Sequence, residues 1–383
     1  MYKFLPYMTN DFSVGLFNEE VNDIYHSAFG ALTEAYEKFA NPAKEKFKHN
    51  DDDFKTFDVL DLCYGIGYNT KALIDSALDF KVNLNIDCVD NDAVLFLLAP
   101  FIESYINFFK RRIYKNLLIK NIGQYDEATK ILKIKQNNIR YVLSDKVKYI
   151  LFNNLLNSDL IHDDSYINIA EKILLDKRNT PFFDKNMLNL YQFLSKRDIY
   201  LPQKINLNAF VHNIYYKYVS KRYLNRFKIN FYNTDVRHFV KKNIANYDLI
   251  LMDGFTPSKT PSIWTVDIFF ELYRLMNNDG FLITYNTSAP VRNAMVQAGF
   301  YIGNIFDSNN KLCGTIASKN ISNIKHTLSN VQAGLLKTKA GIPYRDKNLS
   351  LDNDTILLNR QKEFEDSNLI SSSKYLKDCK NGI

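Results

Sequence analysis

The sequence has little of what marks a metal-binding, disulfide-rich or membrane-spanning protein. Its four cysteines, Cys63, Cys88, Cys313 and Cys379, are scattered without the pairing of a metal site. The longest apolar stretch, residues 93–102, has about half the length that crosses a bilayer. The N-terminus has neither the basic start nor the apolar run of a signal peptide. We therefore expect a soluble, cytoplasmic protein with no metal and no membrane contact, and disorder only around Ser371–Ser373.

Positive charge is unevenly distributed along the chain. Residues 108–150 hold 11 Lys and Arg against 3 Asp and Glu, and residues 214–242 hold 8 against 1. The net charge of the whole chain is only +7, so the remainder is acidic. Such segregation favours a polyanionic partner over a small neutral substrate. The alternative is that these lysines cover ordinary solvated helices.

The chain opens with strand and helix signals in alternation. An apolar run at 57–62 leads through a glycine turn into a helical stretch at 71–78. A second strand, at 82–89, ends beside Asp90 and precedes a helix predicted at 93–109. This alternation predicts a parallel sheet with right-handed crossovers. The fold class is α/β, a Rossmann-like sheet.

Strand signals return after a long interruption. Strands are predicted at 228–232, 247–252, 281–286 and 312–317, helices at 266–276 and 291–299, and a turn at 277–280. The interruption contains helical stretches at 168–174 and 187–195, with hairpin signals around 128–142. We therefore predict a core split between 1–102 and 228–320, a mainly helical basic insertion at 103–227, and a C-terminal extension at 321–383.

The glycine turn indicates a cofactor site. Gly65 and Gly67 follow the first core strand, where a side-chain-free backbone can approach a ligand at the carboxyl edge of the sheet. Asp90 ends the next strand, where its carboxylate can accept hydrogen bonds from ribose hydroxyls. The turn lacks the third glycine of a nicotinamide fingerprint, and Asp61 stands before it. This favours a nucleoside with an amino-acid tail, whose ammonium Asp61 can meet. The alternative is a plain tight turn, with Asp90 as a helix cap.

Two further segments supply candidate residues. Asp235 follows the strand at 228–232 and can accept from an adenine amino group; the alternative is a surface Asp in a basic stretch. Asp253 ends the strand at 247–252, and the loop after it contains Pro257, Pro261 and Trp264. Asp253 is thereby placed at the mouth of the cleft. Trp264 either stacks on a base or anchors the loop on the core.

Several motifs together resemble one family. The run MDGFTPSKTPSIW (252–264) is similar to the signature loop of the methyltransferase half of the bifunctional tRNA 5-methylaminomethyl-2-thiouridine biosynthesis proteins, and stand-alone members of that family exist. DLCYGIGYNT, NIDCVDNDAV, NTDVRHF and GFLITYNTSAPVRNAMVQAGF resemble its other motifs, as do segments 23–39 and 339–349. The sequence departs at Cys63, where a glycine is usual, and in the long 103–227 insertion. The basic stretch of the family near its last strand is thin here.

The resemblance implies a class I methyltransferase fold and a set of site residues. S-adenosylmethionine is the implied cofactor, bound by Asp61, Gly65, Gly67, Asn69, Asp90 and Asp235. Asp253 is the implied catalytic residue. The implied substrate-binding residues are Gly254, Phe255, Pro257, Lys259 and Trp264. No second glycine fingerprint follows, so we expect a separate flavin-dependent oxidase to act upstream.

The sequence therefore predicts S-adenosylmethionine-dependent methylation of the aminomethyl group of 5-aminomethyl-(2-thio)uridine at the tRNA wobble position. Two rivals remain. An aminopropyltransferase also alkylates an amine from a sulfonium, but it needs an acidic pocket for a polycation. A non-catalytic RNA-binding protein on a methyltransferase fold is suggested by Cys63 and opposed by the intact Asp61, Asp90 and Asp253.

Overall fold

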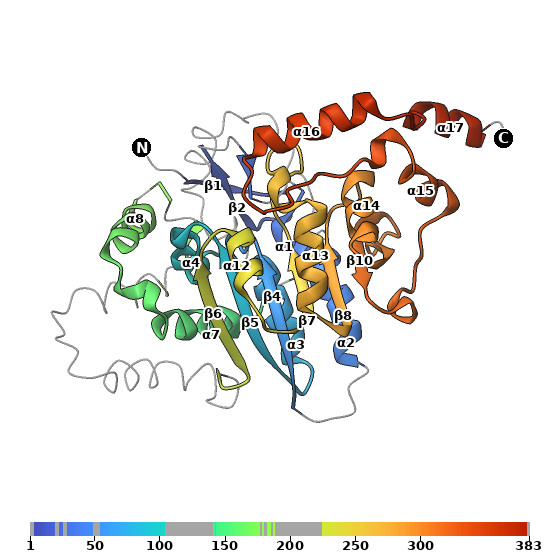
Figure 1. The fold of residues 1–383 in the computed structure, drawn as a ribbon. Helices are drawn as coiled ribbons and strands as arrows, with labels where there is room; N and C mark the ends of the chain where they lie inside the picture. The colour runs from blue at the N-terminus through green and yellow to red at the C-terminus, as the bar shows by residue number, and fades with distance from the viewer. Residues whose placement is uncertain are drawn as a thin grey trace. The chain divides into compact units, whose positions relative to one another are not determined.

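The computed structural model describes residues 4–19, 23–25, 29–48, 54–103, 141, 143–176, 178–179, 182–184, 187 and 224–380 (Figure 1). The chain divides into two compact units, each described by itself. Unit 1 comprises Met1–Tyr36, Tyr64–Leu84 and Asp92–Phe231, and unit 2 comprises Glu37–Cys63, Asn85–Asn91 and Tyr232–Ile383. Within the described residues, no helix is both long and apolar enough to span a membrane.

A mainly parallel sheet forms the core of the described chain. Its seven strands lie in the order β6-β5-β4-β7-β8-β10-β9. The bounds are β4 Lys55–Leu62, β5 Val82–Asp90, β6 Phe227–Asn233, β7 Tyr247–Met252, β8 Met276–Thr284, β9 Tyr301–Phe306 and β10 Leu312–Ser318. β4 pairs with β7, and β7 with β8, in parallel, whereas β10 runs antiparallel to both β8 and β9. The predicted Rossmann-like α/β class is confirmed.

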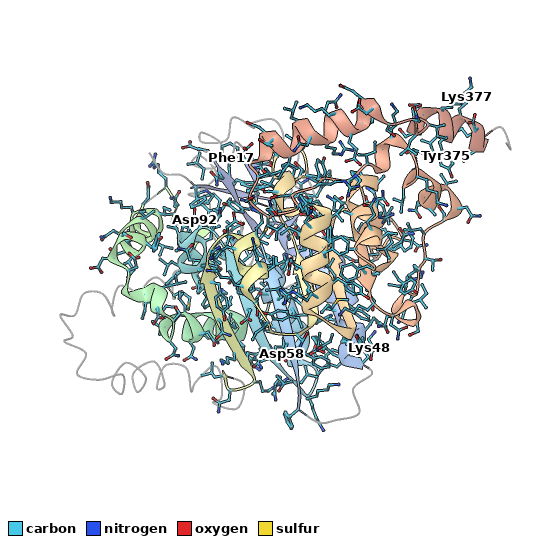
Figure 2. The ribbon with its side chains drawn as sticks, in the orientation of Figure 1. Phe17, Lys48, Asp58, Asp92, Tyr375 and Lys377 are labelled. Carbon is cyan, nitrogen blue, oxygen red and sulfur yellow. The ribbon has the colours of Figure 1, made fainter. Side chains whose placement is uncertain are left out.

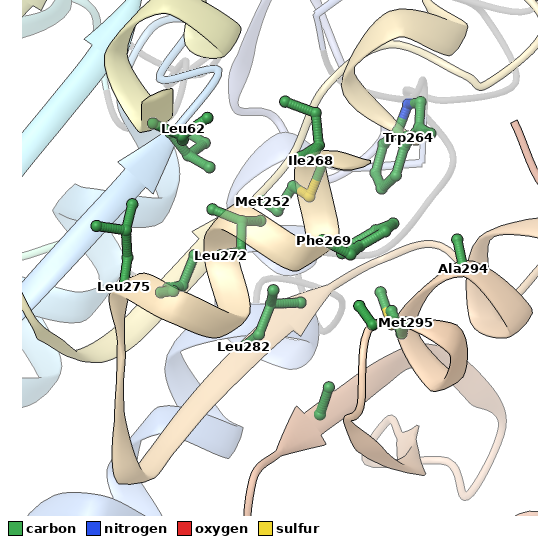
Figure 3. Close-up of a cluster of buried hydrophobic side chains, with 14 of the residues drawn as sticks. Leu62, Met252, Trp264, Ile268, Phe269, Leu272, Leu275, Leu282, Ala294 and Met295 are labelled. Carbon is green, nitrogen blue, oxygen red and sulfur yellow. The ribbon is translucent and has the colours of Figure 1, made fainter. Parts of the chain in front are cut away.

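The centre of unit 2 is apolar because β4 and β7 are buried along their final residues. Leu62 and Met252, which end these strands, belong to a buried cluster with Ile268, Phe269 and Leu272 of α13 (Val266–Leu275), as Figure 3 shows. Apolar residues recur along α13 at helical spacing, and Thr265 caps it by accepting from the Ile268 N–H. This packing fixes where β7 ends.

The other core helices begin at recognisable caps or at proline. Asp92 caps α4 (Ala93–Leu98), and Pro290 lies in the first turn of α14 (Ala289–Gln297). The remaining core helices are α3 Tyr68–Leu78 and α12 Val236–Lys242. Asp92, and not Asp90, is therefore the helix cap in this part of the chain.

Two predicted boundaries are wrong. The helix expected at 93–109 ends at Leu98, and a short 3-10 turn at Ala99–Phe101 follows. Pro100 lies in that turn, and a proline inside a helix removes a backbone donor. The turn expected at 277–280 lies instead within β8, where the register with β7 shifts between Tyr247 and Leu249. Residues 277–280 therefore form a bulge-like irregularity within β8 and do not end the strand.

A small antiparallel sheet at the N-terminus was not predicted. It consists of β1 Phe4–Met8, β2 Val14–Asn18 and β3 Asp23–Ile24. Asp11 fastens its first turn: its carboxylate accepts from the Ser13 N–H at 3.0 Å and from the Thr33 N–H at 2.7 Å. Gly30 has φ +148°, and a Cβ there would lie 2.4 Å from the Asp11 carboxylate. α1 (Ala31–Glu34), a π-helix at Ala35–Ala40 and α2 (Asn41–Lys48) follow.

The C-terminal extension is helical in unit 2. Its helices are α15 Asn330–Leu335, α16 Asn353–Asp366 and α17 Ser372–Lys380. The expectation of disorder around Ser371–Ser373 is wrong, because α17 begins there. Tyr375, labelled in Figure 2, donates from its hydroxyl to the Asn330 carbonyl and lies against Gly334. This contact is between segments distant in sequence.

Only part of the predicted insertion is described. α7 (Asp145–Leu156) and α8 (Asp164–Leu175) belong to unit 1, and α8 confirms the helix expected at 168–174. The hairpin signals at 128–142 and the helical stretch after residue 187 lie outside the described residues. Much of the two basic segments does so too. The three-part domain division therefore stays a prediction.

Candidate active site

The glycine turn, residues 64–67, belongs to unit 1 and depends on left-handed backbone conformations. Gly65 has φ +55° and Gly67 φ +74°. A Cβ on Gly67 would lie 2.3 Å from the Tyr64 hydroxyl oxygen, so no side chain fits there. The Gly67 N–H donates to the Tyr64 carbonyl at 2.9 Å and closes the turn. Asn69, another predicted cofactor residue, is buried in the first turn of α3.

A buried lysine that the sequence reading missed fastens this turn. The Lys71 ammonium donates to the Ile66 carbonyl at 2.9 Å and lies 4.9 Å from the centre of the Tyr68 ring. Its side chain is almost fully buried, and burial, followed by the charge of Lys148, lowers the pKa of Lys71 to about 7. The available signal was a lysine directly before the apolar residues 72–74 of α3.

Four predicted carboxylates of unit 2 lie close enough to one thiol, that of Cys63, to act on its pKa. Burial raises the pKa of Cys63, and the charges of its acidic neighbours raise it further; these neighbours are Asp90, Asp253, Asp61 and Asp235. Asp61 is fully buried and Asp90 nearly so. Cys63 itself has φ +61°, the conformation for which glycine is the usual residue. The structure thus brings together four acids from four separate segments of the sequence.

Asp253 lies where the sheet changes winding direction. β4, the first core strand, is flanked by β5 on one side and by β7, the fourth, on the other. Asp61 is in register with Leu251, and the Asp253 N–H donates to the Leu62 carbonyl at 3.3 Å. Open α/β sheets bind ligands beyond the carboxyl ends of strands at such a point. Asp253, partly exposed, therefore lies at this edge of the sheet, and its catalytic role stays a prediction.

The loop after β7, residues 253–264 and here named the β7 loop, is held by donors to its own carbonyls. The Tyr285 hydroxyl donates to the Gly254 carbonyl at 3.0 Å, and the Trp264 indole N–H donates to the Phe255 carbonyl at 2.8 Å. The two aromatic rings meet edge to face at 5.8 Å. The Thr260 hydroxyl is a second donor to Phe255, at 3.1 Å. The loop is thereby fixed near Asp253.

Residues of the β7 loop differ in what they expose. Trp264 is fully buried, which favours the anchoring alternative over base stacking for this side chain. Pro257 is partly exposed and Lys259 exposed, so both are available to a substrate. Gly254 is buried, and a Cβ there would lie 2.0 Å from Ile263. Tyr285 was not among the predicted residues, although its position just beyond the end of β8 at Thr284 is a usable signal.

Asp235 interacts with both the backbone and the side chain of Arg237. Its carboxylate caps α12 by accepting from the Arg237 N–H at 2.8 Å, and it pairs with the Arg237 guanidinium at 3.0 Å. Burial alone would raise the pKa of Asp235, but the hydrogen bonds and charge of Arg237 outweigh it, so this pKa lies below its usual value. The carboxylate therefore stays ionised at neutral pH, and 47% of its side chain is exposed.

Comparison with known proteins shows which families and structures this chain resembles. A model of the S-adenosyl-L-methionine-dependent methyltransferase family matches residues 204–320. That match covers the second half of the predicted core and not the whole chain. The crystal structure of MnmC2 from Aquifex aeolicus has a similar fold, with a TM-score of 0.55 and 17% identity, over 95% of this chain and 86% of that one. The predicted fold resemblance and the predicted class of S-adenosylmethionine-dependent methyltransferase are confirmed.

Two curated relatives differ in how much of the chain they match. An uncharacterized protein of Methanocaldococcus jannaschii is 26% identical over 371 residues, which cover 96% of this chain and 75% of that protein. The tRNA 5-methylaminomethyl-2-thiouridine biosynthesis bifunctional protein MnmC of Burkholderia vietnamiensis is 36% identical over 66 residues. That match covers 17% of this chain and 10% of the bifunctional protein. Similarity to the bifunctional proteins is therefore local.

Each unit, taken by itself, has residues whose chemistry suits S-adenosylmethionine. Unit 2 has carboxylates, which accept hydrogen bonds from ribose hydroxyls, an adenine amino group or an ammonium. Unit 1 has a glycine turn whose Gly67 position has no room for a side chain. Asp61, Gly65, Gly67, Asn69, Asp90 and Asp235 remain the residues predicted to hold S-adenosylmethionine.

Proposed function

We propose that the methyltransferase transfers a methyl group from S-adenosylmethionine to the primary amine of 5-aminomethyl-(2-thio)uridine at the tRNA wobble position. The observation that carries the proposal is Asp253, placed at the winding switch of the sheet beside a fixed loop. Local similarity to proteins named for 5-methylaminomethyl-2-thiouridine biosynthesis supports the same substrate.

In the proposed reaction, the protein forms no covalent bond with the substrate. When bound, S-adenosylmethionine supplies an electrophilic methyl group on a sulfonium. The chain must hold the amine in line with that methyl group, and the amine must be neutral to attack. An ordinary Asp has a pKa near 3.9 and is a weak base, so orientation of the amine by a charge-assisted hydrogen bond is the main role proposed for Asp253. Removal of the proton is its lesser role.

The β7 loop supplies the substrate contacts in this proposal. Lys259 is exposed and carries positive charge for a phosphate, while Gly254, Phe255 and Pro257 shape the entry beside Asp253. Trp264 takes part by anchoring the loop. The basic segments at 108–150 and 214–242 are proposed to contact tRNA, and a separate flavin-dependent oxidase is proposed to act upstream.

Nucleoside mass spectrometry on tRNA from a strain lacking the gene tests the substrate. Loss of 5-methylaminomethyl-2-thiouridine with accumulation of the unmethylated aminomethyl nucleoside is the expected result. The purified chain should then methylate that tRNA from labelled cofactor. Unchanged tRNA, together with transfer of a labelled aminopropyl group from decarboxylated S-adenosylmethionine to putrescine and release of methylthioadenosine, would instead identify an aminopropyltransferase. No product from either, with tRNA bound, would identify a non-catalytic RNA-binding protein.

Replacement of Asp253 by Asn tests the catalytic role. Turnover should fall while cofactor affinity stays unchanged, because the amide keeps the shape but loses the charge. If residual activity recovers as rising pH deprotonates the amine, the carboxylate mainly served the proton. Uniformly slow turnover at every pH assigns it to positioning. Turnover near that of the unmodified protein would remove Asp253 from the mechanism.

A further inference from the structure

Among the described residues, the carboxylate of Asp235 accepts its hydrogen bonds from one arginine, Arg237. Oδ1 accepts from the Arg237 backbone N–H at 2.8 Å and from Nε at 3.2 Å, and Oδ2 accepts from Nη2 at 3.0 Å. A carboxylate offers about four lone-pair positions, so within the described part of the chain three are used and one on Oδ2 is left. The paired geometry also fixes the plane of the carboxylate. Asp235 can therefore accept one more hydrogen bond, from a defined direction.

Arg237 is itself held from its far side. Its Nη1 donates to the Leu351 carbonyl at 2.7 Å and lies 3.4 Å from the carboxylate of Asp346. Asp346 is fully buried and accepts from the backbone N–H groups of Ser350, at 2.9 Å, and Leu351, at 3.2 Å. The guanidinium therefore bridges two carboxylates, one buried and one half exposed. Its orientation is set by the C-terminal segment rather than by solvent.

The segment around Asp346 is tied to the core of unit 2. The Asp346 N–H donates to the Asp267 carboxylate at 2.6 Å, and the Val266 N–H donates to the Tyr344 carbonyl at 2.9 Å. The donor Val266 and the acceptor Asp267 both lie in the first turn of α13. Residues 344–351 thus join α13 to α12, although they lie outside the stretch that the family model matches.

We propose that Arg237 is a positioning residue that presents the remaining lone pair of Asp235 to the 6-amino group of the cofactor adenine, with Asp346 holding Arg237 in place. The inference rests on the proposed role of Asp235 in cofactor binding. Adenine offers a donor at this position, whereas hypoxanthine offers an acceptor, which an ionised carboxylate repels. The C-terminal segment thereby sets the base specificity of the site.

Calorimetric dissociation constants for S-adenosylhomocysteine and S-inosylhomocysteine test the proposal, because the two ligands differ at the 6-position. The measured quantity is the ratio of the two constants for each variant. A partly unfolded sample affects both ligands alike, so the ratio stays interpretable. Arg237→Gln is the main variant. Arg274→Gln is its matched control, since Arg274 also fastens α12, but through the Val240 and Asn243 carbonyls at the other end.

The unmodified protein should favour the adenosyl ligand by about tenfold or more, the scale of one hydrogen bond to a charged group. Asp235→Ala should abolish this preference, and Arg237→Gln should reduce it to about threefold or less. Arg237→Lys should recover part of it, because lysine restores charge but not the paired geometry. Arg274→Gln should leave the ratio unchanged.

Two results would overturn the inference while leaving the cofactor site intact. One is equal affinity of the unmodified protein for both ligands, and the other is a full preference retained by Arg237→Gln. Failure of the unmodified protein to bind either ligand would overturn the proposed cofactor site together with the inference. Asp346→Asn offers a second check, since it should lower the preference without touching Asp235 directly.

Discussion

The glycine turn and the β7 loop are shaped by opposite means. In the turn, Gly65 and Gly67 adopt left-handed conformations, and bare backbone is what the turn offers a ligand. In the β7 loop, Tyr285 and Trp264 donate to consecutive carbonyls, so side chains determine the backbone path. We therefore expect the conformation of the glycine turn to be disrupted by added side-chain atoms, and that of the β7 loop by lost hydrogen bonds.

The largest effect is expected from Gly67→Val. A left-handed conformation costs a residue with a Cβ about 1–2 kcal/mol, and the Cβ would also overlap the Tyr64 ring. Cofactor binding should be lost in calorimetry, and the melting temperature should fall. The double variant Gly67→Ala with Tyr64→Ala separates the two causes, since it removes the overlap and keeps the strain. Normal cofactor affinity in Gly67→Val would contradict a backbone-shaped site.

Asp90→Ala comes next and tests the carboxylates around Cys63. Loss of hydrogen bonds to a charged acceptor should weaken cofactor binding by roughly 1.5–3 kcal/mol. Asp79→Ala is the control, because Asp79 is an exposed residue just beyond the end of α3. Equal affinities for the two variants would remove Asp90 from the cofactor site.

Lys71, whose ammonium donates to the glycine turn, gives the stability of the protein a pH dependence. Its folded pKa is near 7 and its unfolded pKa near 10.4, so between these values the unfolded chain binds more protons. The free energy of unfolding from this group should rise by about 1.4 kcal/mol per pH unit from pH 7 to pH 10 and fall as pH drops toward 7. Denaturant titrations should show a flatter profile for Lys71→Met. Parallel profiles for the two proteins would contradict a buried, neutral Lys71.

The smallest effect is expected from Trp264→Phe, which keeps an apolar ring and removes the indole donor. Since the Thr260 hydroxyl still donates to Phe255, the cost in stability should be about 1 kcal/mol. KM for tRNA should rise several-fold with cofactor affinity unchanged. Thr260→Val is the matched variant, because it removes the other side-chain donor to the Phe255 carbonyl. A change in cofactor affinity instead would show that the loop also shapes the cofactor site.

Much of this fold could be predicted because its core strands are short apolar runs. The strand expected at 247–252 has the bounds of β7, and Asp61, Asp90, Asp235 and Asp253 were named from their positions at or beside strand ends. What escaped prediction depends on contacts distant in sequence. Arg237 gains its role from residues 346 and 351, and Tyr285 from a carbonyl at 254. No local pattern encodes such pairs.

The N-terminal sheet and the end of the chain escaped prediction for a related reason. Strands of two to five residues carry too little alternation to stand out, and β1–β3 depend on the Asp11 carboxylate to close their first turn. Helix α17 has no buried residue, so its sequence has no apolar pattern from which the helix could be predicted. Its Tyr375 instead packs on a glycine in α15.

The single tryptophan of the chain is also an optical probe of the β7 loop. Trp264 is fully buried and bound to the Phe255 carbonyl, so selective excitation of indole should give blue-shifted emission from this one position. Opening of the loop would expose the ring to water and shift the emission to longer wavelength. Stopped-flow fluorescence could therefore time the arrival of RNA at the loop, separately from methyl transfer, without any attached dye.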